Sequence, residues 1–156
     1  MAEESIITPE LRDLLGKEGE PEYFEVEKGH IKRFAQALGD PNPLWSDLDY
    51  ASKSRYGNII APPTFLINAG IIKLAVKLTD MMGPSRNFLD VGMEIEYYKP
   101  IEVGDTITST AKLVDLKEKS GKKGIILIML LEVTYKNQRG EVVRKCRNTF
   151  ISSDGK

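Results

Sequence analysis

The sequence predicts an α+β fold in which one long apolar helix lies buried against an antiparallel sheet. Two observations lead to this prediction. In the first half of the chain most apolar residues recur at helical spacing, whereas after residue 87 they alternate with polar residues, as in a half-buried strand. The later strands are joined by short turns, and strands joined in this way pair antiparallel. With 156 residues, the chain has the length of one domain with its own core.

Proline at the start of a helix and glycine after its end mark most of the expected boundaries. The expected segments are a helix over 9–15 capped by Thr8, a strand over 23–26, a helix over 28–38 ended by Gly39, a loop over 40–45, and a short helix up to Ala51 capped by Ser46 or Asp47. A further helix is expected from Pro63 to about Leu78, with Met81 and Met82 beyond it. It is apolar almost all round at its start, which indicates burial there.

Four strands are expected after residue 87. The first contains Met93, Ile95 and Tyr97, which alternate with Glu94, Glu96 and Tyr98. The others are expected over 106–116, 125–135 and 141–152, and the nearly continuous apolar run of 125–135 marks the central strand. The charged segment 117–123 indicates a solvated hairpin loop, and 137–140 a four-residue hairpin connection.

Composition excludes several classes of function. Lys and Arg number 22 against 23 Asp and Glu, so no net basic charge favours nucleic acid or an acidic membrane surface. One cysteine, Cys146, and one histidine, His30, allow neither a disulfide framework nor a Cys- or His-rich metal site, so no metal is expected. The longest apolar run spans 125–131, well short of the roughly 20 residues of a membrane helix. With no secretory signal at the N-terminus, a cytoplasmic protein is expected.

Three stretches carry a family resemblance. They are Phe34-Ala35 before Gly39-Asp40-Pro41-Asn42-Pro43, then Tyr56-Gly57-Asn58-Ile59-Ile60-Ala61-Pro62-Pro63-Thr64-Phe65, and later Tyr98-Lys99-Pro100 with Gly104-Asp105. In these residues the chain resembles the MaoC-like branch of the hotdog superfamily, in particular the N-terminal dehydratase half of fatty-acid-synthase-type enzymes. The resemblance covers roughly residues 22–152. It implies a single hotdog domain over 22–156, preceded by an extension with a short helix over 1–21.

The resemblance implies a hotdog fold, a long central helix wrapped by a curved antiparallel sheet, and a second hotdog paired with the first. MaoC-like enzymes interconvert trans-2-enoyl thioesters and (R)-3-hydroxyacyl thioesters of coenzyme A or acyl carrier protein, and they need no cofactor. In that family an Asp and a His in a G-D-x-N-P-x-H pattern activate water. A backbone N–H at the start of the central helix polarises the thioester carbonyl, as an oxyanion donor does.

Two departures from the family pattern affect the predicted site. Asp40 and Asn42 match the catalytic Asp and its supporting Asn, but Trp45 stands where the family has His, and indole cannot shuttle a proton. Pro63 stands where active members have glycine, and it has no N–H to offer, so the N–H of Thr64 is the expected substitute. Local turn chemistry and packing beside the central helix would also explain Asp40 and Trp45.

The predicted catalytic residues are therefore Asp40 and Asn42, and the predicted substrate-binding residues are Trp45, Pro63, Thr64 and Phe65. The predicted function is a subunit of an (R)-specific enoyl-thioester hydratase or 3-hydroxyacyl dehydratase. It would act as a homodimer, or as a heterodimer with a hotdog chain that supplies the histidine. Two alternatives stay open: a non-catalytic acyl-thioester-binding module, and a hotdog thioesterase that uses Asp40 as base or nucleophile. The chain is thus expected to be an enzyme as a component of a lyase, with Trp45 in place of the family's catalytic His.

Overall fold

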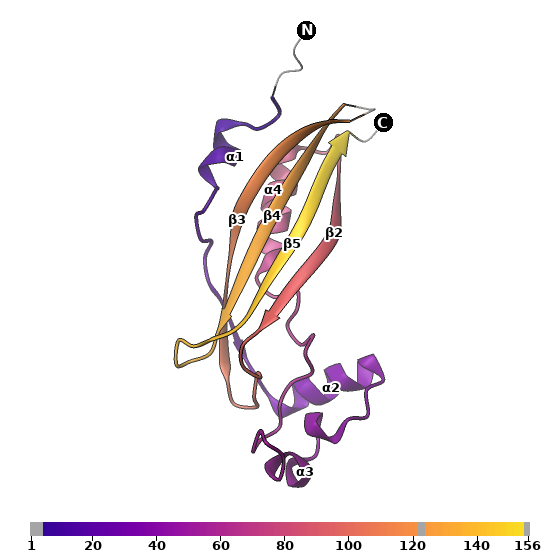
Figure 1. Ribbon diagram of the computed structural model, residues 1–156, viewed down its shortest axis with the longest axis vertical. Coiled ribbons are helices and arrows are strands. Elements are labelled where there is room, and N and C mark those ends of the chain that lie inside the picture. Colours follow the sequence, from indigo (N-terminus) through magenta and orange to yellow (C-terminus); the bar gives the residue numbers. More distant parts are fainter. Residues whose placement is uncertain (1–4, 122–123, 155–156) are drawn as a thin grey trace.

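The computed structural model of the chain describes residues 5–121 and 124–154. Its centre is a five-stranded antiparallel sheet, curved along the strands, with α4 (Ile71–Met82) lying along one face (Figure 1). In spatial order the strands are β1 (Glu22–Glu25), β3 (Thr106–Gly121), β4 (Gly124–Lys136), β5 (Val142–Asp154) and β2 (Arg86–Tyr97). The predicted α+β class, and a helix partly wrapped by a curved sheet, are confirmed.

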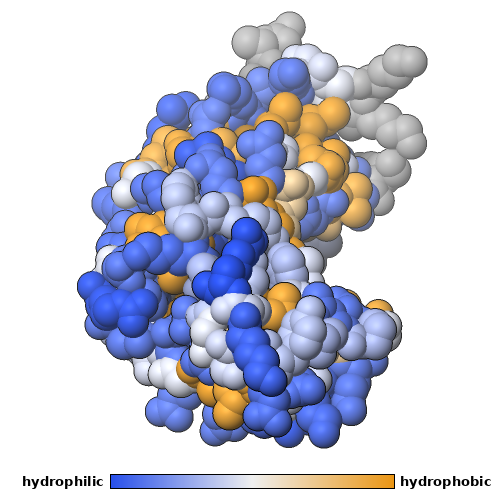
Figure 2. All heavy atoms as spheres, turned by 60° about the horizontal axis from the view of Figure 1, so that its bottom comes forward, coloured by the Kyte–Doolittle hydropathy of each residue, from blue (hydrophilic) through white to orange (hydrophobic). Residues whose placement is uncertain are grey.

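The smaller helices lie around this sheet. They are α1 (Pro9–Asp13), α2 (Lys28–Leu38), the 3₁₀ turn η1 (Pro43–Trp45) and α3 (Leu48–Ser52). Figure 1 shows α1 beside β3 and places α2 and α3 together beyond one end of the strands. Seen from that end, the surface is mostly hydrophilic, with separate hydrophobic patches and a hollow on one side (Figure 2). None of the helices within 5–121 and 124–154 is long and apolar enough to cross a membrane.

Alternation along the three long central strands builds the core. Along much of β3 and β4 every second side chain is buried, and the buried apolar ones belong to one cluster with those of α4. The buried apolar residues of these elements are Ile71, Leu78, Ile107, Ala111, Leu113, Leu127, Met129, Leu131, Val133 and Tyr135. Full burial of one aliphatic side chain stabilises the fold by about 1.5–3 kcal/mol. Register shifts beside Val91 and Val114 add local twist, which helps the sheet to curve.

The helix caps predicted in the first half of the chain are confirmed. The prediction for α2 is confirmed in both bounds, and Gly39 adopts the left-handed conformation (φ 68°) that ends a helix. Thr8 Oγ1 accepts a hydrogen bond from the Leu11 N–H, although α1 is two residues shorter than expected. Of the two cap candidates for α3, the structure selects Asp47, whose Oδ1 accepts from the Tyr50 N–H.

Two expectations about longer elements were wrong. The central helix begins at Ile71 rather than at Pro63, and it continues through Met82, so Met81 and Met82 are helical. The charged segment after Leu116 is mostly strand, because β3 pairs with β4 as far as Gly121. Charged side chains suit that extension because they point to solvent while the backbone pairs. Residues 122–123 of the expected hairpin loop lie outside the described residues.

Candidate functional site

The loop between α2 and η1 is held together by the side chain of Asp40. Its Oδ1 accepts a hydrogen bond from the Asn42 N–H at 3.0 Å, and its Oδ2 accepts one from the indole Nε1–H of Trp45 at 2.8 Å. Asn42 Oδ1 in turn accepts from the Leu44 N–H at 3.0 Å and so caps η1. The structure therefore brings together all three residues that the sequence motif singled out in this loop.

Trp45 is buried, with 7% of its surface exposed. The indole offers one polar group, an N–H, and that group already donates to Asp40. An imidazole in the same place would keep a second nitrogen for proton transfer, whereas the indole has none. The Asp40–Trp45 pair thus has the hydrogen bond of an Asp–His pair without its acid-base chemistry.

The second predicted group of site residues lies in the segment 63–70, which forms successive turns instead of the first turns of a helix. Leu66 has a positive φ of 57°, and Gly70 caps α4 with a φ of 82°. A positive φ at leucine is costly and persists only where other contacts require it. Because α4 starts at Ile71, the expected position of Pro63 and Thr64 in a first helical turn was wrong, and the Thr64 N–H as oxyanion donor stays a prediction.

Side chains of the sheet explain why this segment is not helical. Arg144 Nη1 donates to the carbonyl oxygens of Pro63 at 3.0 Å and Phe65 at 2.8 Å. The Tyr135 hydroxyl lies 3.2 Å from the Ile67 carbonyl oxygen and 2.8 Å from that of Ala69. Four carbonyl groups of alternate residues therefore face donors on the sheet, and a helix would turn these groups along its own axis.

These donors belong to one row that crosses the sheet. Cα pairing places Glu22, Ser109, Tyr135, Arg144 and Tyr97 side by side on the five strands. The Tyr97 hydroxyl also reaches the Pro63 carbonyl oxygen, at 3.1 Å. Burial raises the pKa of Tyr135, which keeps its hydroxyl protonated and able to donate. The row is the support on which the segment 63–70 rests.

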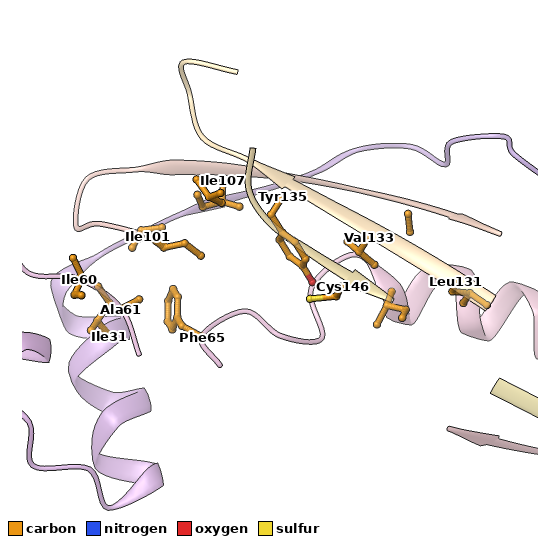
Figure 3. Packing of buried hydrophobic residues seen from close by; sticks show 14 of the residues in the cluster. Ile31, Ile60, Ala61, Phe65, Ile101, Ile107, Leu131, Val133, Tyr135 and Cys146 are labelled. Carbon is orange, nitrogen blue, oxygen red and sulfur yellow. The ribbon is translucent and has the colours of Figure 1, made fainter. Parts of the chain in front are cut away.

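Sequence reasoning missed Arg144 and the two tyrosines of this row. One signal could have found Arg144: it stands two residues before Cys146 on a predicted strand, so it shares a face with a free cysteine, a residue type that is usually buried. Cys146 is buried, and burial raises the pKa of its thiol. Figure 3 shows Tyr135 and Cys146 close together, and Phe65 between them and Ile31 of α2.

A cavity of about 370 Å³ opens beside the loop that contains Trp45, and its volume is within the size range of small-molecule sites. Its walls come from Arg55 and Tyr56, the stretches 60–63 and 97–101, Trp45 and Arg144. Two of the predicted binding residues, Trp45 and Pro63, line it. Asp40 and Asn42 are not among its lining residues.

The other predicted binding residues lie apart from this cavity. Phe65 is buried and makes an edge-to-face contact with Phe34, at 5.5 Å between ring centroids. Both rings line a second, more open hollow of about 610 Å³, which also includes His30 and Leu66. Thr64 lines neither of these two spaces. Of the four predicted substrate-binding residues, two thus line the 370 Å³ cavity, one lines the second hollow and one lines neither.

The lining of the 370 Å³ cavity is basic. Arg55, Lys99 and Arg144 belong to it, and no Asp or Glu is among its described lining residues. Lys99 is paired with Glu141 outside the cavity wall, and the Arg55 guanidinium lies over the Tyr56 ring with its carbon 4.8 Å from the centroid. The apolar remainder of the wall comes largely from prolines, isoleucines and tyrosine rings. This combination suits a ligand with an apolar part and a negatively charged or strongly polarised oxygen.

Comparison with known proteins gives the same fold and a family match. The family model described as "FAS1-like, dehydratase domain region" matches residues 13–146. A UPF0336 protein of Thermobifida fusca is 32% identical over 119 residues, which cover 74% of this chain and 78% of that protein. A UPF0336 protein of Mycobacterium tuberculosis, Rv0635, is 23% identical over 137 residues, covering 86% of this chain and 84% of the relative.

Solved structures of MaoC-like enzymes superpose on the chain. The MaoC-like dehydratase of Rhodospirillum rubrum has a TM-score of 0.73 at 23% identity and covers 94% of this chain and 97% of its own. The HadBC (3R-hydroxyacyl-ACP dehydratase) complex of M. tuberculosis gives 0.70 at 23%, covering 89% and 97%. The (R)-hydratase of A. caviae gives 0.66 at 18%, covering 87% and 94%. These likenesses confirm the predicted hotdog fold.

Proposed function

The chain belongs to the family of FAS1-like dehydratase regions, and from that membership we propose that it is the acyl-thioester-binding subunit of an (R)-specific enoyl-thioester hydratase or 3-hydroxyacyl dehydratase. In this proposal a second hotdog chain supplies the catalytic histidine. One observation carries the proposal: the hydrogen bond from Trp45 Nε1 to Asp40 Oδ2, at 2.8 Å, where the family pattern has an imidazole.

The chemistry of the reaction explains why this hydrogen bond matters. Hydration of a 2-enoyl thioester needs one group that takes a proton from water and one that delivers a proton to the carbon next to the carbonyl. A histidine beside an aspartate can do both, because the imidazole exchanges protons near neutral pH. Trp45 can do neither, and both oxygens of Asp40 already accept hydrogen bonds from their own loop.

A place for a partner chain exists on the sheet. β2 pairs with β5 on one side and forms one edge of the described sheet, so its other edge can pair with a further strand. Leu89 and Val91 of β2 are exposed, as are Ile72 and Val76 of α4. Two of the similar structures, HadBC and ChsH1–ChsH2 of M. tuberculosis, are complexes of two different chains. A heterodimer of two hotdogs is therefore the assembly that we propose.

The alternative of a non-catalytic acyl-thioester-binding module draws on the same observation, since the Asp40–Trp45 pair suits binding without turnover. The thioesterase alternative has less support. It needs the Asp40 carboxylate in contact with the ligand, and Asp40 is absent from the lining of the 370 Å³ cavity. Turnover in the presence of a partner separates the two remaining proposals.

The test is coexpression of this chain with each hotdog chain of its own genome that carries an intact G-D-x-N-P-x-H motif. Hydration of crotonyl-CoA and of longer trans-2-enoyl-CoAs is then measured for the chain alone and for each complex. We expect no turnover by the chain alone, turnover by one complex, and loss of that turnover when the partner's motif histidine is changed to alanine. Full activity of the chain alone would overturn the proposal, and thioester binding without turnover in every pairing would favour the non-catalytic module.

A further inference from the structure

Arg144 is the largest fully buried side chain of the protein, with 1% of its surface exposed. Among the described residues, no carboxylate forms an ion pair with it. Arg147 on the same strand gives a contrast, because it is partly exposed and is paired with Glu132 at 2.8 Å. Buried guanidinium groups are normally neutralised, since a charge without a partner in a protein interior is unfavourable. The charge of Arg144 therefore calls for an explanation.

The hydrogen bonds of the guanidinium group leave one whole edge without a partner. Nη1 donates to the carbonyl oxygens of Pro63 and Phe65, and the group lies over the Tyr135 ring with its carbon 4.3 Å from the centroid. Nε and Nη2 are buried and have no hydrogen-bond partner within residues 5–121 and 124–154. These two nitrogens present parallel N–H bonds along one edge of the guanidinium plane. Such a fork matches the two oxygens of a carboxylate or a phosphate.

The charge of Arg144 is also not balanced by the other lining residues of the 370 Å³ cavity. Arg144 lines the cavity together with Arg55 and Lys99, and Trp45 and Pro63 are in the same wall. Lys99 is neutralised by Glu141, so Arg144 contributes a charge that no described carboxylate balances. Supporting the segment 63–70 requires Nη1 alone, and that role leaves the buried Nε–Nη2 edge unexplained.

We propose that Arg144 is a ligand-binding residue that receives an anionic oxygen group of the acyl thioester in this cavity through its Nε–Nη2 edge. The group is a carboxylate or a phosphate, and it has two sources. It is either a carboxylate at the far end of the acyl chain or a phosphate of the carrier. This inference rests on the proposed function only for the thioester as the ligand, and not for turnover.

The first experiment measures binding to the folded full-length chain by isothermal titration. One arm compares glutaryl-CoA with pentanoyl-CoA, which lacks the terminal carboxylate. The other arm compares the pentanoyl thioester of 4′-phosphopantetheine with that of pantetheine, which lacks the phosphate. We expect one arm, and thereby one source, to show a loss of affinity of at least tenfold. Equal affinity within about twofold in both arms would overturn the proposal.

Two variants test whether the loss of affinity depends on the Nε–Nη2 edge of Arg144. Arg144→Lys keeps a positive charge but has no parallel N–H pair, and it should reduce the difference in the responding arm to about twofold or less. Arg147→Lys is the matched control, since Arg147 lies on β5 and is paired with Glu132, and it should leave the difference unchanged. Retention of the full difference in Arg144→Lys, with the fold intact by circular dichroism, would overturn the proposal.

An NMR measurement on the unmodified chain covers the case in which Arg144→Lys does not fold. The side-chain Nε–H signal of Arg144 should shift on addition of inorganic phosphate or glutarate, while a purely structural arginine would give a signal that neither anion moves. This readout also separates the two proposals. A shift with the small anions but no binding of any thioester would reject the proposed function and retain the anion site. Binding of a thioester with no shift would reject the anion site and retain the proposed function.

Discussion

The two segments that contain the predicted site residues, 39–47 and 63–70, lie next to the same cavity but are held in different ways. In the first, the side-chain hydrogen bonds join residues two to five positions apart. In the second, the side-chain donors come from β2, β4 and β5, between 34 and 81 positions away. The first loop can therefore form its bonds wherever it is placed, whereas the second keeps its shape only on the finished sheet.

Among the changes that follow, replacing Arg144 should have the largest effect on the support of the segment 63–70. Arg144→Met leaves the buried Phe65 carbonyl unpaired, at a cost of about 1–3 kcal/mol, and leaves the Pro63 carbonyl with the Tyr97 hydroxyl as its remaining donor. We expect a loss of about 3 kcal/mol in the free energy of unfolding, measured by urea titration. Arg55→Met is the control: it lines the same cavity but is exposed, so its effect should stay within about 0.5 kcal/mol. Equal effects of the two changes would contradict the support role of Arg144.

Gly70 ends the same segment, and a larger residue at this position would crowd the sheet. A Cβ at this position would lie 2.5 Å from Ser109 Oγ, and the backbone φ of 82° is itself unfavourable for alanine. Gly83 has a similar φ of 79° but nothing within 4 Å of the added Cβ. Gly83→Ala should cost about 1 kcal/mol for the backbone alone. Gly70→Ala should cost about 1–3 kcal/mol more, for overpacking.

Thermal and urea unfolding of the two alanine variants measures this difference. Ser109→Gly should rescue part of the loss in Gly70→Ala, because it removes the atoms that the new Cβ meets. The prediction is wrong if the two alanine variants are equally stable.

The Asp40–Trp45 bond is the matching test for the local loop. A double-mutant cycle of Asp40→Ala and Trp45→Phe isolates the energy of the hydrogen bond from the indole to the carboxylate. For a hydrogen bond to a charged acceptor we expect a coupling of about 1.5–3 kcal/mol at neutral pH, reduced here toward the lower end because Asp40 is only half-buried. Additive single effects, with a coupling near zero, would show that the loop is held by its backbone instead.

The smallest expected effect is that of Tyr97→Phe. The Tyr97 hydroxyl reaches the Pro63 carbonyl at 3.1 Å, but the residue is half exposed and Arg144 Nη1 donates to the same oxygen. Water can replace the hydroxyl at that site, so we expect a loss of about 0.5 kcal/mol. Tyr135→Phe is the comparison at the buried end of the row and should cost more, since the Ala69 carbonyl loses its 2.8 Å donor. Equal losses in the two variants would mean that burial does not decide how much each hydroxyl of the row contributes to stability.

The structural features held by nearby residues were predictable from the sequence, whereas those held by distant residues were not. The bounds of α2, the cap by Asp47 and the turn chemistry around Asn42 were predictable, because each depends on residues within one helical turn. The extension of β3 through its charged residues was missed because pairing with β4 overrides the local pattern. The start of the central helix was misplaced for a related reason. An apolar stretch beginning at Pro63 indicates burial, but it does not reveal that its carbonyls will be bonded to a sheet side-chain row.

The sequence by itself determined the α+β class, the hotdog resemblance, the Asp40–Asn42–Trp45 loop and the absence of a histidine at position 45, since these depend on periodicity and on neighbours in the chain. Only the tertiary structure decided that the segment 63–70 is not helical, that Asp40 stays out of the cavity lining, and that Arg144, a lining residue of that cavity, is buried with two guanidinium nitrogens unpaired among the described residues. The physical reason is that these last features are set by the register of four strand pairings, which aligns one polar residue of every strand in a single row.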